Sequence, residues 1–149
     1  MSFLAEAAEF IARLEGFRDR PYQDATGTWT IGYGTTFLPN GAPVGPQTSP
    51  ITEAEAKAFM MRDLSAYWDR VSLAIRVPLR QGQRIALLSL TYNIGVTAFR
   101  GSTILRLLNE GKQNEAAVAF FDWIMSKGRI VGGLINRRKK ECLLFLQSP

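Results

Sequence analysis

The spacing of apolar residues changes after residue 16, and this change limits the folds that are open to the chain. Phe3, Ile11 and Leu14 recur at helical spacing, which predicts a helix that begins after Ser2 and ends beside Glu15, with Gly16 as its C-cap. From residue 21 to about residue 45 the signals are a turn at 24–27, a strand in TWTIGYG and a second turn at 39–41. A helix followed by a small hairpin sheet is therefore expected.

Helical patterns return after the predicted sheet. Thr52 with Glu55 forms a capping-box pattern and opens a long helix that extends to about residue 73. Four more helices are predicted, at 84–92, 102–109, 114–126 and 134–147, with Gly111 and Gly128 closing the second and third. These elements predict an α+β fold in one domain over residues 1–149. Its sheet lobe covers about 16–50, and its helical lobe covers about 74–149 plus the N-terminal helix.

The chain has no histidine and one cysteine, and this composition excludes whole classes of chemistry. Hydrolases that use a Ser-His or Cys-His pair are excluded, and so is every metal site that needs a histidine ligand. Cys142 stands beside an apolar run and is read as a core residue, with no partner for a disulfide within the chain. Catalysis in this chain is expected to depend on carboxylates, without a metal or cofactor.

The net charge of +5 favours polyanionic partners, which include nucleic acid, an acidic membrane surface and a bacterial wall. The N-terminal apolar stretch contains Glu6 and Glu9 and has no basic residue before Arg13, which is unlike a secretion signal or a membrane span. The chain is therefore expected to be made in the cytoplasm and not to insert stably into a membrane.

Glu15 and Asp24 are the candidate catalytic pair. Hydrolysis of a glycosidic bond needs a proton donor for the leaving oxygen and a second carboxylate that acts as nucleophile or as base for water. Glu15 ends the first helix and Asp24 starts the hairpin, so both can face one cleft between the lobes. The alternation of a strand puts Thr30, Gly32 and Gly34 on one face, where glycines let a sugar ring approach and Thr30 can hold a water. By spacing alone, these residues are also compatible with an ordinary solvated surface.

The run EGFRDRPYQDATGTWTIGYG resembles the active-site segment of the phage-type lysozymes, which are endolysins. The pattern of that family is Glu, eight residues, Asp, five residues and Thr, and Glu15, Asp24 and Thr30 fall on it. Two further runs, NIGVTAFRGSTILRLLNEG and GGLINRRKKECLLFL, resemble lambdoid members of the same family. The resemblance covers nearly the whole chain.

The resemblance implies a muramidase that hydrolyses the β-1,4 bond between N-acetylmuramic acid and N-acetylglucosamine with inversion. In this family Glu15 would be the general acid, Asp24 would activate a water and Thr30 would help to hold it. Arg137 matches an arginine that pairs with the catalytic Glu, and Asn93 matches a residue that follows the central helix. Many members carry a histidine where this chain has Thr35, which removes a local ion pair and a group that titrates near neutral pH.

Two other functions compete with this interpretation. A lytic transglycosylase cuts the same bond with one Glu and without water, and it would not need Asp24 or Thr30. A non-enzymatic basic protein that binds wall or nucleic acid would use only the positive charge. The favoured interpretation predicts a monomer that binds peptidoglycan glycan strands, binds no nucleic acid and reaches the wall after release from the cytoplasm. A phage or prophage endolysin is the expected setting, and a tail-borne or injected lysin is the alternative.

Overall fold

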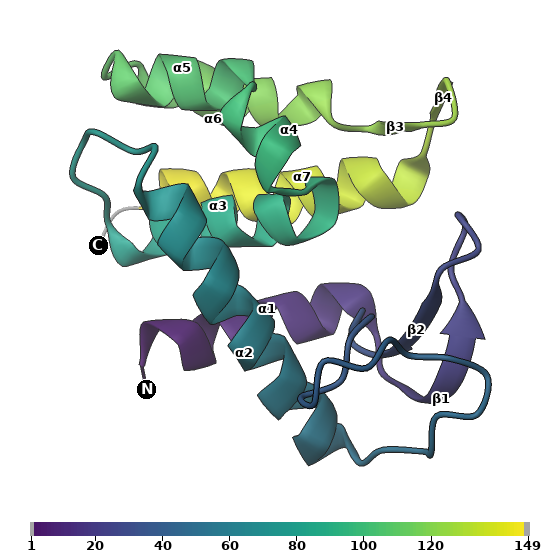
Figure 1. Ribbon diagram of the computed structural model, residues 1–149. Coiled ribbons are helices and arrows are strands. Elements are labelled where there is room, and N and C mark those ends of the chain that lie inside the picture. The colour runs from purple at the N-terminus through teal and green to yellow at the C-terminus, as the bar shows by residue number, and fades with distance from the viewer. Residues whose placement is uncertain (1, 148–149) are drawn as a thin grey trace. The chain divides into compact units, whose positions relative to one another are not determined.

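The computed structural model describes residues 2–147, which form helices and two small antiparallel sheets (Figure 1). The elements are α1 (Phe3–Glu15), β1 (Arg18–Gln23), β2 (Trp29–Gly32), α2 (Glu53–Ser72), α3 (Gln81–Ile94), α4 (Val96–Arg100), α5 (Thr103–Asn109), α6 (Gln113–Ala119), a 3-10 turn η1 (Phe120–Asp122), β3 (Met125–Ser126), β4 (Arg129–Ile130) and α7 (Gly132–Leu146). This order of elements confirms the predicted α+β class. No helix within residues 2–147 has the length and apolar character needed to cross a membrane.

The chain divides into two compact units. One ends at Ala66 and contains α1, the β1–β2 sheet and most of α2, whereas the other begins at Tyr67 and contains α3 to α7. The N-terminal helix thus falls in the same unit as the larger sheet. The expectation of one domain over residues 1–149 stays a prediction.

Both ends of α1 are capped by the residues that the sequence singles out. The hydroxyl of Ser2 accepts a hydrogen bond from the backbone N–H of Ala5 at 3.2 Å. Gly16 ends the helix with φ +72°, a conformation that costs glycine little, and its N–H donates to the carbonyl of Ala12. Glu15 is consequently the last helical residue, one position before the chain reverses.

The β1–β2 sheet is anchored to the first residue of α2. The two strands are antiparallel, with Tyr22 opposite Thr30 and Gln23 opposite Trp29. The hydroxyl of Tyr33, just after β2, donates to the carboxylate of Glu53 at 2.8 Å. Burial and this hydrogen bond raise the pKa of Tyr33 to about 12. Tyr33 therefore stays protonated and keeps donating to Glu53 throughout the pH range in which proteins normally fold.

Gly32 lies in close contact with the first turns of α2. A Cβ atom at this position would lie 3.0 Å from the Cβ of Ala56 and 3.2 Å from the Cδ1 of Ile51. The backbone of Gly32 also has φ +67°, a conformation that L side chains rarely adopt. Both the backbone and the packing of β2 against α2 therefore require glycine here.

The second unit is built around α3, which is buried on most of its surface, as its apolar sequence predicts. The α7 helix packs along α3 (Figure 1). Inside this pair lies a buried ionic cluster: Glu141 accepts from the hydroxyl of Ser89 at 2.5 Å and pairs with Arg137 at 3.2 Å and Arg138 at 3.1 Å. Burial raises the pKa of Glu141, and the two guanidinium groups oppose this rise. The apolar core beside it includes Leu87, Leu90, Phe99, Ile104, Leu108, Phe120 and Phe145.

The predicted helix at 114–126 is wrong in its second half. The α6 helix ends at Ala119, and β3 and β4 form a hairpin with a turn at Lys127 and Gly128. These two residues have φ +51° and φ +77°, as the two-residue turns of hairpins require. A glycine with positive φ can be a helix C-cap or a hairpin-turn residue, so Gly128 by itself does not distinguish a helix end from a hairpin. The short helix α4 was not predicted.

The contact between Gly32 and α2 yields a stability prediction. We expect Gly32→Ala to lower the free energy of unfolding by roughly 2–5 kcal/mol, because it adds a steric clash to an unfavourable backbone conformation. Gly41→Ala is the matched control, since Gly41 has φ +85° and open space around its Cβ position, and it should cost only about 1–2 kcal/mol. Urea unfolding measures both. If both variants lost the same free energy of unfolding, Ala56 would be able to shift away from the new Cβ atom without a cost in stability.

Candidate active site

Glu15 is placed by the end of α1. It is half-buried and stands directly before Gly16, where the chain turns out of the helix toward β1. The helix end and the turn at Gly16 fix the backbone from which the Glu15 side chain extends. Such a group is suited to donate a proton to a bound molecule.

Asp24 is held by the turn that joins β1 to β2. Its Oδ1 atom accepts three hydrogen bonds: from the hydroxyl of Thr26 at 2.7 Å, from the N–H of Thr26 at 2.9 Å and from the N–H of Thr28 at 3.0 Å. The bond from the Thr26 hydroxyl is the largest cause that lowers the pKa of Asp24, followed by the bond from the backbone of Thr28. Its Oδ2 atom has no hydrogen-bond partner among residues 2–147. Asp24 is thus an oriented, ionised carboxylate with one oxygen left to accept a proton.

Thr30 lies on β2 and is buried. Its hydroxyl donates to the carbonyl of Thr28 at 3.0 Å, which uses the only hydrogen of that hydroxyl. The remaining lone pairs of Oγ1 can still accept a hydrogen bond. Toward a water molecule, Thr30 therefore acts as an acceptor.

Tyr22 lies beside Thr30 in the sheet, and no pattern in the sequence indicates its importance. It is the sheet partner of Thr30, and the guanidinium of Arg18 lies 4.4 Å from the centre of its ring. Burial raises the pKa of Tyr22, Arg18 opposes the rise, and the charges of Glu15 and Asp24 add to it. Because charge effects fall with distance, both carboxylates lie within electrostatic reach of this phenol. Tyr22 is therefore the strand partner of Thr30 and is affected by the charges of Glu15 and Asp24. The joint site of Glu15, Asp24 and Thr30 stays a prediction.

The glycines of the strand differ in their surroundings. Gly32 is buried against Ala56, so packing within the unit already explains it, and a role for Gly32 in holding a sugar ring stays a prediction. Gly34 has φ +101° in the turn through which Ile31 and Thr35 pair their backbones. Thr35 is buried, and its hydroxyl lacks a hydrogen-bond partner within the part of the chain that the structure describes.

Arg137 and Asn93 lie in the second unit. The Nε atom of Arg137 is 3.2 Å from Glu141, and its Nη2 atom donates to the carbonyl of Ser89 at 3.0 Å. The side chain of Asn93 accepts a hydrogen bond from Arg138 and so connects the end of α3 to α7. The expected pair of Arg137 with Glu15 stays a prediction.

Comparison with known proteins identifies relatives over most of the chain. The family model described as phage lysozyme matches residues 12–141. An endolysin of Acyrthosiphon pisum secondary endosymbiont phage 1 is 40% identical over 91% of each chain. Among solved structures, an endolysin from Escherichia coli O157:H7 phage FAHEc1 has 35% identity and a TM-score of 0.88, and the match covers 100% of this chain and 96% of that one. The muramidase domain of SpmX from Asticaccaulis excentricus has 37% identity and a TM-score of 0.85, with 96% of each chain covered.

The hydrogen bonds to Asp24 predict how its titration responds to mutation. Thr26→Val removes the largest cause of the low pKa, so Asp24 should titrate at a higher pH, closer to an ordinary aspartate. Thr26→Ser keeps a hydroxyl and should leave the low value in place. Carbon-detected NMR titration of the Asp24 carboxyl measures both variants.

The same titration has a consequence for stability and a simple control. Because the pKa of Asp24 is lowered in the folded state, its contribution to stability is present above the unfolded-state pKa and is lost as pH falls through the folded value. Thr97→Val changes an exposed threonine of α4 and should leave the Asp24 titration unchanged. If Thr26→Val left the Asp24 titration at the wild-type value, the turn would not be what keeps Asp24 ionised.

Proposed function

This chain belongs to the phage lysozyme family and is a peptidoglycan-degrading glycoside hydrolase, and from that membership we propose the roles of its side chains. Glu15 is the general acid, Asp24 is the general base, and Thr30 holds the water that attacks. The bond cut is the β-1,4 bond between N-acetylmuramic acid and N-acetylglucosamine. The observation that carries the proposal is the Asp24 carboxylate, which has one oxygen fixed by three donors and the other unpartnered among residues 2–147.

The hydrogen-bond pattern defines how the water is activated. Since the Thr30 hydroxyl already donates to the Thr28 carbonyl, a water between the two side chains donates one hydrogen to Thr30 and the other to Oδ2 of Asp24. Its lone pair is then directed away from both side chains and toward the anomeric carbon. Thr30 thus orients the water, while Asp24 takes its proton.

The reaction balances with these groups alone. The water oxygen bonds to the anomeric carbon as the bond from that carbon to the leaving oxygen breaks. Asp24 receives the proton that the water loses, and Glu15 gives its proton to the leaving oxygen. Attack on the face opposite the leaving group inverts the anomeric configuration. The product is a reducing N-acetylmuramic acid end.

The state of Asp24 favours hydrolysis over transglycosylation. A transglycosylase uses a hydroxyl of the substrate itself as the nucleophile and has no need for an ionised second carboxylate. Here the turn supplies several donors that stabilise the ionised form of Asp24. That arrangement serves a base that accepts a proton from water.

The proposal extends to partners and setting. Family membership supports peptidoglycan glycan strands as the partner, and the positive charge of the chain suits a wall whose peptides and polymers carry negative charges. That the chain binds no nucleic acid is part of the same proposal. The chain acts as a monomer, needs no cofactor, and reaches the wall after release from the cytoplasm in which it is made. Arg137, Asn93, Gly32 and Gly34 support the site without taking part in the bond changes.

The direct test of the acid is Glu15→Gln. An amide of the same shape cannot donate the leaving-group proton, so lysis of purified peptidoglycan should fall by at least about 100-fold while circular dichroism stays that of the wild type. Glu115→Gln changes an exposed glutamate of α6 and should keep full activity. A folded Glu15→Gln enzyme with more than a few per cent of wild-type activity would contradict the assignment.

A further inference from the structure

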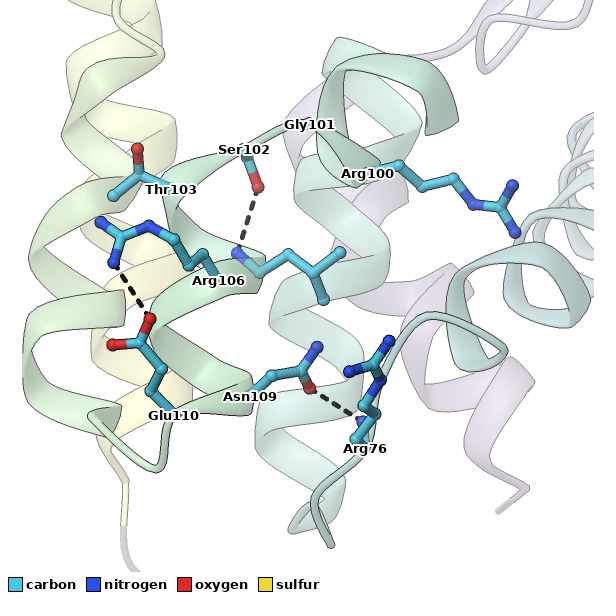
Figure 2. A pocket seen from close by; sticks show the side chains of 9 residues that line it. Arg76, Arg100, Gly101, Ser102, Thr103, Arg106, Asn109 and Glu110 are labelled. Atoms are coloured by element: carbon cyan, nitrogen blue, oxygen red, sulfur yellow. Dashed lines mark hydrogen bonds and ion pairs between the residues drawn. The ribbon is translucent and has the colours of Figure 1, made fainter.

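The second unit contains a pocket of about 500 Å³ that none of the proposed catalytic residues lines. Its walls come from the loop between α2 and α3, the end of α4 and one side of α5 (Figure 2). This volume falls within the usual range for small-molecule sites, roughly 300–1,000 Å³. Its lining residues are Arg76, Arg100, Gly101, Ser102, Thr103, Leu105, Arg106, Asn109 and Glu110.

Positive charge dominates this lining, because it contains three arginines and one glutamate. Glu110 pairs with Arg106 at 3.1 Å and with Lys112, outside the pocket, at 3.1 Å. The carboxylate of Glu110 is thus shared between two cations. Glu110 therefore does not neutralise the charges of Arg76 and Arg100.

Arg76 and Arg100 are the two groups able to receive a ligand. The guanidinium of Arg76 has no hydrogen bond or ion pair within the part of the chain that the structure describes. Arg100 donates only to the backbone carbonyl of Arg70, at 3.3 Å, and pairs with no carboxylate among residues 2–147. Figure 2 shows both side chains on one side of the pocket, with the Arg106–Glu110 pair on the other.

The wall that carries Arg76 is fixed in place by Asn109. The Oδ1 atom of Asn109 accepts from the backbone N–H of Arg76 at 2.8 Å, and its Nδ2 atom donates to the carbonyl of Ala74 at 2.9 Å. Ser102 fixes the turn between α4 and α5, since its hydroxyl donates to the backbone carbonyl of Phe99 at 2.6 Å and accepts from the N–H of Leu105. The backbone around the pocket is therefore ordered before any ligand arrives, which reduces the entropic cost of binding.

We propose that this pocket binds a phosphate ester of a small polyol, with Arg76 and Arg100 contacting the phosphate. A phosphate group offers several oxygens to two guanidinium groups at once, and such charge-assisted hydrogen bonds are strong. A pocket of about 500 Å³ is larger than a free ion needs, so the polyol occupies the rest, beside the hydroxyl of Thr103 and the apolar side chain of Leu105. Glycerol phosphate is the simplest molecule of this class.

The test is an NMR titration of the folded wild-type chain with glycerol phosphate at constant ionic strength. We expect saturable shifts confined to the amide signals of residues 74–76 and 100–106, with a Kd on the order of 1 mM or tighter. Arg76→Gln and Arg100→Gln should each weaken binding about tenfold. Arg129→Gln, which changes an exposed arginine of the β3–β4 hairpin, should bind like the wild type. Amide spectra of the free variants verify that each one folds.

Three further probes separate recognition of a phosphate ester from simple charge attraction. Inorganic phosphate should cause shifts at the same residues but bind more weakly, and acetate should bind more weakly still. Shifts spread over all basic residues, or equal binding by Arg76→Gln and Arg129→Gln, would overturn the proposal. If glycerol phosphate bound no better than inorganic phosphate, the polyol would have no place in the pocket and the proposed ligand class would be wrong. Strong binding to phosphatidylglycerol vesicles without binding of free glycerol phosphate would also overturn it.

Discussion

The turn around Asp24 is the constraint on which the rest of the candidate site depends. Three donors to a single oxygen of Asp24 close the turn between β1 and β2. That closure sets the strand register, which places Thr30 opposite Tyr22. The same bonds favour the ionised form of the carboxylate and leave its second oxygen available. One local arrangement therefore fixes the geometry of the sheet and the protonation state of the proposed base.

Much of the fold follows from local signals, and the errors have a local cause. Caps and apolar spacing correctly predicted α1, α2, α3, α5 and α7, because a cap or a buried face leaves a direct trace in the sequence. The spacing of apolar residues gave a wrong prediction at residues 120–130, where Gly128 lies in a hairpin turn and does not end a helix. The short α4 was missed because five residues are too few to show a period.

The site was only partly predictable from the residues. Glu15, Asp24 and Thr30 were isolated by the family pattern, and spacing alone did not separate them from an ordinary surface. Tyr22 was missed because its significance comes from strand pairing and from the charges near it, which no local pattern reports. The sequence pattern places Gly32 on a face open to a sugar ring, which stays a prediction, and it does not reveal the contact of Gly32 with Ala56 of α2, because these residues are far apart in sequence. The neighbours of Tyr22 and Gly32 depend on tertiary packing, which the local sequence pattern does not report.

Digestion of purified peptidoglycan in ¹⁸O-labelled water shows whether Asp24 activates a water. We expect the label at the anomeric carbon of new reducing N-acetylmuramic acid ends, which form first in the α configuration. We also expect Asp24→Asn to lose this product, whereas Asp122→Asn, a change at an exposed aspartate, keeps it. An unlabelled 1,6-anhydro product from the wild-type enzyme, or a labelled product from Asp24→Asn at nearly the wild-type rate, would show that Asp24 does not activate a water.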